Sequence, residues 1–114
     1  MPPNTQRTLL CSIDEIEPNN ARGFEIQGQS ILVVRHETQV YAYLNQCPHT
    51  GVELNWMPDR FMDLEKEYIQ CSVHGALFKI NNGLCIAGPC QGRHLQKIPV
   101  AIENNLIYAN PDLI

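Results

Sequence analysis

Short apolar runs separated by turn-forming residues make up most of this chain. The longest aliphatic run, from Ile31 to Val34, has only four residues, far fewer than a membrane-spanning helix needs. Several other runs alternate apolar and polar residues with the period of two that is typical of β-strands. The pattern predicts an all-β domain with no membrane span.

The predicted strands lie between these turn-forming residues. Residues 23–27 and 30–36 are expected to form a hairpin around Gly28 and Gln29, with residues 39–44 as the next strand. Alternation in that strand places its two tyrosines on one face and its valine and alanine on the other. One or two helical turns are expected within residues 59–68. We also expect an early strand containing Cys11, further strands at residues 67–71, 76–80, 84–87, 95–102 and 106–109, and turns at Asn81-Asn82-Gly83 and Asn104-Asn105.

Composition narrows the class of protein. With 114 residues, 44% of them hydrophobic and 18% charged, the sequence is that of one globular domain spanning residues 1–114. The net charge of −4 argues against broad nucleic-acid binding, because that needs a basic face. The five cysteines are an odd number, and residues 1–6 lack the basic-then-apolar pattern of a secretory signal. We therefore expect a cytoplasmic protein with reduced thiols, in which metal binding is favoured over a disulfide framework.

Two short motifs combine cysteine with histidine in loops between predicted strands. In Cys47-Pro48-His49 the candidate ligands are two residues apart, and in Cys71-Ser72-Val73-His74 they are three apart. A glycine follows each motif. Thiolates and imidazoles are ligands that both zinc and iron accept, so two of each would fill four coordination positions.

The order of these ligands distinguishes between metals. In many zinc sites one motif supplies both cysteines and the other both histidines, whereas here each motif supplies one of each. If the thiolates bind one iron and the imidazoles bind a second, each loop contacts both metals. This is the ligand arrangement of a Rieske 2Fe-2S centre, in which histidine replaces cysteine on one iron.

The sequence resembles the Rieske ferredoxin family over nearly the whole chain, residues 8–109. The resemblance rests on Cys-Pro-His-Thr-Gly at 47–51, on Cys-Ser-Val-His-Gly-Ala-Leu-Phe at 71–78, and on the segment 83–89, which is similar to the family's turn that covers the cluster. It implies a Rieske-like fold of stacked antiparallel sheets with two cluster-binding loops, and one 2Fe-2S cluster. The cluster and metal ligands that it implies are Cys47, His49, Cys71 and His74.

The same resemblance implies a function. We expect a soluble one-electron carrier that takes electrons from a flavoprotein reductase and passes them to an oxygenase or a similar terminal enzyme. The chain contains neither a Gly-rich nucleotide motif nor an acid/base pair with supporting context, so we expect an electron-transfer component without catalytic residues of its own. Two alternatives stay open, namely a small accessory subunit of a nitrite reductase-like enzyme and a zinc-stabilised interaction module.

Neighbours of the motifs bear on the expected reduction potential. Respiratory Rieske proteins, as the family is known, carry an extra cysteine in each loop, and Ser and Tyr hydroxyls near the cluster sulfurs. The matching positions in this chain are Val52 and Val73, and Ala76 and Phe78. Fewer hydrogen bonds to sulfur stabilise the reduced state less, so we expect a potential at the low end of the Rieske range.

The spacing between the two motifs is longer than is common in the family. Twenty-one residues separate His49 from Cys71, and the extra length lies between Trp56 and Glu67. We expect the apolar residues of this insertion to anchor it by local packing, with a partner-docking patch as the alternative. These apolar residues are Trp56, Met57, Phe61 and Met62.

The insertion and its surroundings are acidic. Residues 50–70 contain five acidic and two basic side chains, which suits either a solvated face or a docking surface for a basic partner. Reversing Asp63 and Glu65 to Lys is expected to slow association with such a partner.

Besides Cys11, four cysteines and histidines lie outside the two motifs. The spacing of Cys85 and Cys90 allows them to pair across a turn, but free thiols are favoured. His36 and His94 are interpreted as surface or strand residues rather than ligands.

Overall fold

The middle layer of the molecule is a four-stranded antiparallel sheet. The computed structural model describes residues 7–48, 51–55, 59–72 and 75–110. The sheet has the order β2-β3-β4-β8. Its strands are β2 (Asn20–Ile26), β3 (Gln29–His36), β4 (Gln39–Leu44) and β8 (Lys97–Ile98).

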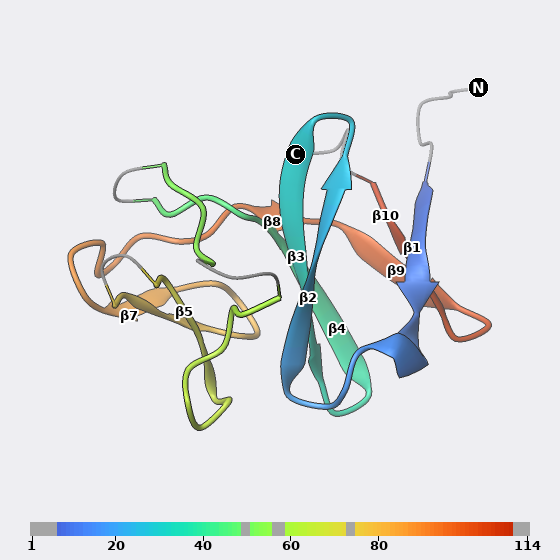
Figure 1. Cartoon of the computed structure of the whole chain (residues 1–114), viewed down its shortest axis with the longest axis horizontal. Coiled ribbons are helices and arrows are strands. Elements are labelled where there is room, and N and C mark those ends of the chain that lie inside the picture. The colour runs from blue at the N-terminus through green and yellow to red at the C-terminus, as the bar shows by residue number, and fades with distance from the viewer. Residues whose placement is uncertain (1–6, 49–50, 56–58, 73–74, 111–114) are drawn as a thin grey trace.

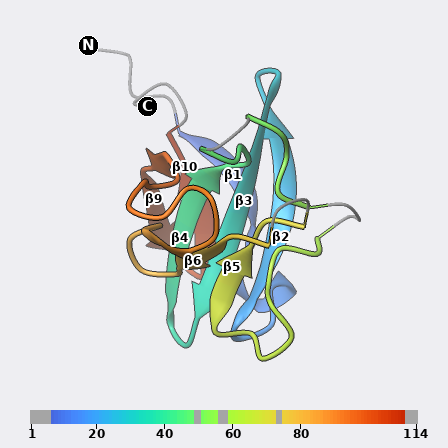
Figure 2. The ribbon, with the colours of Figure 1, turned by 90° about the vertical axis from the view of Figure 1, so that its left-hand side faces the viewer.

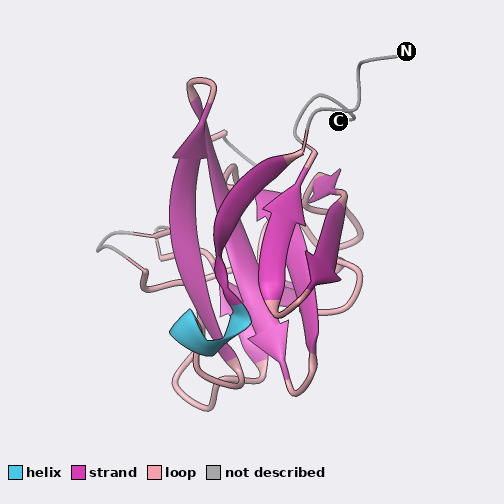
Figure 3. Cartoon of the chain, turned by 90° about the vertical axis from the view of Figure 1, so that its right-hand side faces the viewer, coloured by secondary structure: helices cyan, strands magenta, loops and turns pink. Residues whose placement is uncertain are grey.

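Two three-stranded sheets lie on opposite sides of this middle sheet (Figure 1). One contains β1 (Thr8–Ser12), β10 (Leu106–Ala109) and β9 (Val100–Glu103), and faces the viewer in Figure 3. The other contains β5 (Tyr68–Gln70), β6 (Leu77–Lys79) and β7 (Cys85–Ala87), and lies toward the viewer in Figure 2. All pairings are antiparallel, so the predicted all-β class with stacked antiparallel sheets is confirmed.

The middle sheet is buried on both faces. Ile31 and Val33 of β3 pack into the core shared with β1 and β10. Leu32 and Val34 pack into the core shared with the β5-β6-β7 sheet, called the small sheet below. All four side chains have an exposed fraction of 0%. Because a strand covered on both sides needs apolar residues at every position, this burial explains why the longest aliphatic run lies here.

The alternation predicted for residues 39–44 is also confirmed. Val40 and Ala42 of β4 pack on the β1–β10 side, and Tyr43 packs on the side of the small sheet, with the partly buried Tyr41 against the same core. The hydroxyl of Tyr43 donates a hydrogen bond to the carbonyl oxygen of Ile80 at 2.5 Å. This bond attaches the middle sheet to the chain leaving β6.

Several strand boundaries differ from the prediction. The turn of the hairpin between β2 and β3 consists of Gln27 and Gly28, both with positive φ, and lies one residue earlier than predicted. The predicted strand over residues 95–102 is divided into β8 and β9 at Pro99, where the chain leaves the middle sheet for the outer one. Proline lacks the N–H group that a continuous ladder requires, which accounts for the division. β4 and β10 have the predicted bounds.

The helical turns predicted within residues 59–68 are wrong. Asp59 and Lys66 have positive φ values of 61° and 58°, which are incompatible with a right-handed helix. The Asp63 carboxylate accepts hydrogen bonds from the backbone N–H groups of Glu67 and Tyr68, at 2.9 and 3.1 Å. The segment therefore forms a turn closed by a side chain, a known competitor of helix formation.

One helical turn occurs where none was predicted. Ile13–Glu15 form a 3₁₀ turn directly after β1, which contains Cys11 as predicted. Ser12 and Glu15 make a reciprocal capping box at its start, a spacing visible in the sequence. No helix in the described ranges is long and apolar enough to cross a membrane.

Candidate metal centre

Two buried cysteines begin the loops that carry the sequence motifs. Cys47 follows β4 by three residues, and Cys71 directly follows β5. Their exposed fractions are 1% and 0%, and both belong to the core between the middle sheet and the small sheet. The two strands thus deliver two thiols to one core.

The two loops close with the same backbone hydrogen bonds. The N–H of Cys47 donates to the carbonyl of Val52 at 2.8 Å, and the N–H of Gly51 donates back to the carbonyl of Cys47 at 2.7 Å. In the second loop the N–H of Cys71 donates to Ala76 at 2.9 Å, and the N–H of Gly75 donates back to Cys71 at 2.8 Å. Gly51 and Gly75, at corresponding positions, both have positive φ. The cysteines therefore occupy equivalent places at the base of two matching loops.

Hydrogen bonds hold the first loop closed and join it to the second. The side-chain oxygen of Asn45 accepts from the N–H of Leu54 at 2.8 Å, and its amide donates to Ser30 and Asn55. The N–H of Ser72 donates to the carbonyl of Leu54 at 2.8 Å. Asn45 is 6% exposed, and its network satisfies a polar side chain that would otherwise be costly to bury.

A third segment, residues 88–93, packs against both loops. The Cα of Gly88 lies so near the second loop that a Cβ added there would be 2.7 Å from the Cα of Ala76. The Arg93 guanidinium donates a hydrogen bond to the carbonyl of Pro48 in the first loop, at 3.0 Å. The Gly88 contact agrees with the resemblance of residues 83–89 to a covering turn.

Two more buried thiols lie in this region, Cys90 on the third segment and Cys85 at the start of β7. The Sγ of Cys90 donates to the Sγ of Cys85 at 3.0 Å, and the Sγ of Cys85 donates to the carbonyl of Ala87 at 3.2 Å. No disulfide joins any of the five cysteines, all of which lie in the described ranges, so the preference for free thiols at Cys85 and Cys90 agrees with the structure. Burial, followed by the neighbouring Cys85 and Cys47 side chains, raises the pKa of the Cys90 thiol to about 12.

The predicted histidine ligands, His49 and His74, lie outside the described residues, as do Trp56 and Met57 of the insertion. The described part of the chain therefore places the two cysteines of the predicted ligand set and leaves the histidines as predictions. Within that part, no group of three or more His, Cys, Asp or Glu side chains is arranged to hold a metal ion.

Two other predictions on residue position are confirmed. Phe61 is buried, and it packs against the place on β2 where Gly23 lacks a side chain, so it does anchor the insertion. Met62 is partly buried against the same core. His36 ends β3 and His94 follows the third segment, both exposed.

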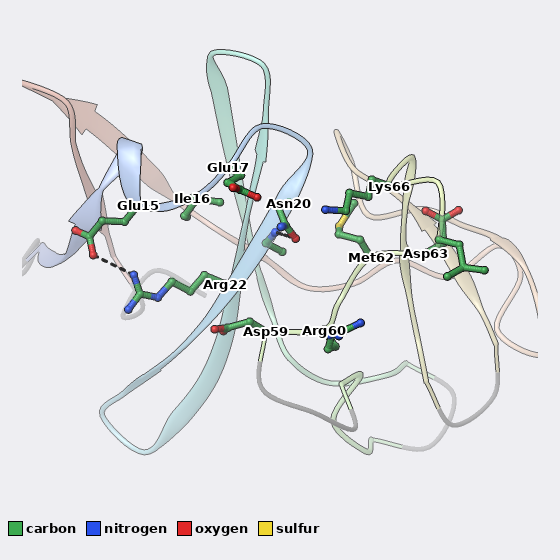
Figure 4. Close-up of a pocket in the computed structure, with 12 residues that line it drawn as sticks. Glu15, Ile16, Glu17, Asn20, Arg22, Asp59, Arg60, Met62, Asp63 and Lys66 are labelled. Atoms are coloured by element: carbon green, nitrogen blue, oxygen red, sulfur yellow. Dashed lines mark hydrogen bonds and ion pairs between the residues drawn. The ribbon is translucent and has the colours of Figure 1, made fainter.

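The acidic part of the insertion lies along the edge of β2. A groove of about 780 Å³ separates the two, with Glu17, Asn20 and Arg22 on one wall and Asp59, Asp63 and Lys66 on the other (Figure 4). Asp59 accepts a hydrogen bond from the N–H of Gly23, and Asp63 closes its own turn. Charge reversal at Asp63 would therefore damage the turn, which makes it a poor test of docking.

Comparison with known proteins identifies the family. A family model described as Rieske [2Fe-2S] domain matches residues 6–102. The chain belongs to the Rieske [2Fe-2S] family. Its cofactor is accordingly one 2Fe-2S cluster, and two buried thiols at equivalent positions of joined loops are a donor set that suits such a cluster.

Individual Rieske proteins match over different shares of their length. The ferredoxin component of the naphthalene 1,2-dioxygenase/salicylate 5-hydroxylase systems of Ralstonia sp. is 29% identical over 92 residues, 81% of this chain and 83% of that protein. The carnitine monooxygenase oxygenase subunit of Escherichia coli (strain K12) is 29% identical over 118 residues, 93% of this chain and 30% of that subunit. The solved ferredoxin of carbazole 1,9a-dioxygenase from Nocardioides aromaticivorans IC177 is 24% identical, with a TM-score of 0.77 over 93% of this chain and 98% of that chain. This last likeness confirms the Rieske-like fold.

Three residues of the Rieske site were missed by sequence reasoning. Asn45, Arg93 and Cys90 all contact the first loop or its cysteine. Asn45 lies two residues before the Cys47-Pro48-His49 motif, but nothing in that motif points to it, and Arg93 belongs to no motif. Only Cys90 was singled out, and then as half of a pair with Cys85.

Replacing Gly88 by Ala tests the contact between the third segment and the second loop. Gly88 and Gly92 both have positive φ, 101° and 93°, so an alanine at either position costs about 1–2 kcal/mol of backbone strain. Only at Gly88 does the new Cβ overlap another residue; at Gly92 nothing lies within 4 Å. We expect Gly88→Ala to lose the visible absorption of the cluster on warming faster than Gly92→Ala. Equal rates of loss would show that the contact with Ala76 does not support the site.

Proposed function

We propose that this chain is a one-electron carrier with a single Rieske domain over residues 1–114, soluble in the cytoplasm. It takes electrons from a flavoprotein reductase and delivers them to an oxygenase or a similar terminal enzyme. The observation that carries the proposal is the likeness to a relative named as the ferredoxin component of an oxygenase system, which is 29% identical over 92 residues, 83% of that relative.

The proposed ligands are Cys47 and Cys71 for one iron, and His49 and His74 for the other. The matching backbone closure of the two loops supports this assignment, because it places the cysteines equivalently. Each histidine belongs to the same short motif as one of these cysteines. When bound, the cluster supplies a site that accepts and releases one electron. The protein contributes ligands, burial and a surface on which partners dock.

Two other functions are less well supported. A zinc-stabilised interaction module does not agree with membership of a [2Fe-2S] family. A small subunit of a nitrite reductase-like enzyme would carry the same cluster, but three of the similar relatives are named as ferredoxin components or subunits of oxygenase systems.

Substitution of the proposed ligands tests the assignment. Purified protein should be red-brown with paired iron and acid-labile sulfide, and its reduced form should give a Rieske-type EPR spectrum. We expect replacement of Cys47, His49, Cys71 or His74 by Ala to abolish the paired iron and the signal. Matched controls at Cys11 and His94, the same residue types outside the motifs, should retain both. Full iron content in any of the four ligand variants, or colourless protein with one zinc, would refute the assignment.

The reduction potential is expected to lie at the low end of the Rieske range, on the order of −150 mV. The physical reason is the lack of hydroxyl donors at Ala76 and Phe78, both fully buried beside the second loop. A redox titration monitored by visible circular dichroism measures the midpoint. A strongly positive value is incompatible with this expectation.

Charge reversal tests whether the acidic insertion steers a basic partner. Glu65 and Glu67 are exposed, and reversal there leaves the Asp63 carboxylate that closes the turn in place. We expect Glu65→Lys with Glu67→Lys to slow association with the reductase several-fold at low salt, and the difference to vanish at high salt. Glu25→Lys with Glu103→Lys, in β2 and in β9 of the opposite outer sheet, changes the net charge equally outside the insertion. If both pairs slow association equally, net charge and not the insertion is responsible.

A further inference from the structure

The third segment brings a cysteine that is not a proposed ligand against one that is. Cys85, Cys90 and Cys47 belong to one buried core, and the first two have an exposed fraction of 1% each. The Cys90 Sγ lies 3.0 Å from the Cys85 Sγ, and the Cys47 side chain is a second neighbour in this core, close enough to contribute to the raised pKa of the Cys90 thiol. Cys90 therefore has two sulfur atoms as neighbours.

The two thiols of the Cys85–Cys90 pair differ in what they can donate to. The Cys85 proton points to the carbonyl of Ala87 at 3.2 Å, so it is committed to the backbone. The Cys90 proton points to the Cys85 sulfur, which is a neutral and weak acceptor. Rotation of the Cys90 side chain about its Cα–Cβ and Cβ–Sγ bonds redirects the thiol proton from the Cys85 sulfur toward the Cys47 sulfur.

Metal binding changes the balance between these acceptors. A cysteine that binds iron does so as a thiolate, and hydrogen bonds to ionised acceptors are about twice as strong as those between neutral groups. The Cys90 thiol is neutral at neutral pH, as an ordinary thiol is, and its hydrogen-bond acceptor in the described part of the chain is the neutral Cys85 sulfur. The Cys47 sulfur of the loaded protein is therefore its preferred partner.

We propose that in the loaded protein the Cys90 Sγ–H donates a hydrogen bond to the Cys47 Sγ and raises the reduction potential of the centre. This inference rests on the proposed role of Cys47 as an iron ligand. Adding one electron increases the negative charge on the ligand sulfur, so a donor there stabilises the reduced form more than the oxidised form. No covalent bond changes in the process. Cys90 is thus a positioning residue that acts on the centre through Cys47.

Redox titration of a matched pair of variants tests the proposal. Cys90→Ala removes the donor to Cys47, whereas Cys85→Ala removes an equally buried thiol whose proton is directed to Ala87. We expect Cys90→Ala to make reduction about three- to tenfold less favourable, tenfold being 59 mV for a one-electron couple. Cys85→Ala should leave the midpoint close to that of the unmodified protein. Equal midpoints for Cys90→Ala and the unmodified protein would overturn the proposal.

A serine at position 90 keeps the test independent of packing losses. Cys90→Ser restores a donor, so its midpoint should return to or exceed that of the unmodified protein, while a merely structural role predicts no such rescue. Pulsed EPR of the reduced protein in deuterated buffer should show one exchangeable deuteron coupling that is present with Cys or Ser at position 90 and lost with Ala, beside the couplings of the imidazole N–H groups of the proposed histidine ligands, which all three proteins share. The same deuteron signal in Cys90→Ala would contradict the assignment.

Two further measurements separate this proposal from the assumptions beneath it. Alkylation of the denatured, cluster-free protein should count five thiols. A Cys85–Cys90 disulfide would show that the donor does not exist. Iron content and the EPR signal report on the ligands, so Cys90→Ala with its full cluster and an unchanged potential would overturn the Cys90 inference alone. Retention of the cluster in Cys47→Ala would overturn the ligand assignment on which it rests.

Discussion

Two backbone hydrogen bonds, repeated in each cysteine loop, are the constraint on which the rest of this site depends. The cysteine N–H reaches a carbonyl five residues later, and a glycine four residues after the cysteine returns its N–H to the cysteine carbonyl. Both polar backbone groups of Cys47 and of Cys71 are thereby used, which fixes each side chain at the base of its loop. Within this common frame the histidine occupies the third position of the first loop and the fourth of the second. The same closure is therefore combined with two different sequence positions of the histidine that is proposed as a ligand.

The same core that folds the domain also delivers the cysteines. The middle sheet is covered on both faces, and the core on one of them contains Cys47 and Cys71 together with Leu32, Val34 and Tyr43. A loop placed at the end of such a strand inherits the rigidity of the sheet. This arrangement explains why a small domain can hold an inorganic group without an inter-loop disulfide, since the bonds of Ser72 and Arg93 already join the loops to each other and to the third segment. Any loss of packing in this core would therefore destabilise both the fold and the cysteine loops.

Much of the architecture could be predicted from the sequence because it depends on local pattern. β4 and β10 have the predicted bounds, since clean alternation and flanking Asn or Glu-Thr turns define them. The failures have specific causes. The helical turns expected within residues 59–68 do not form, because the Asp63 carboxylate binds backbone N–H groups there and closes a turn instead. Pro99 divides one predicted strand between two sheets. In the candidate site, the two Cys/His sequence motifs were enough to predict Cys47 and Cys71. The bond from Arg93 to Pro48 spans 45 residues of sequence and has no local signature.

The chemical nature of residue 90 matters for how this site is tuned. Residues around Cys90 are almost entirely apolar, and a hydroxyl buried there in the absence of the cluster would lack a strong acceptor, which costs free energy. A thiol behaves as a small hydrophobic side chain with a weak donor, so it packs well whether or not the cluster is present. The donor strength is correspondingly small. On the proposal made for Cys90, a weak S–H donor would add only a modest increase to the reduction potential, while the apolar core on which folding depends is left intact.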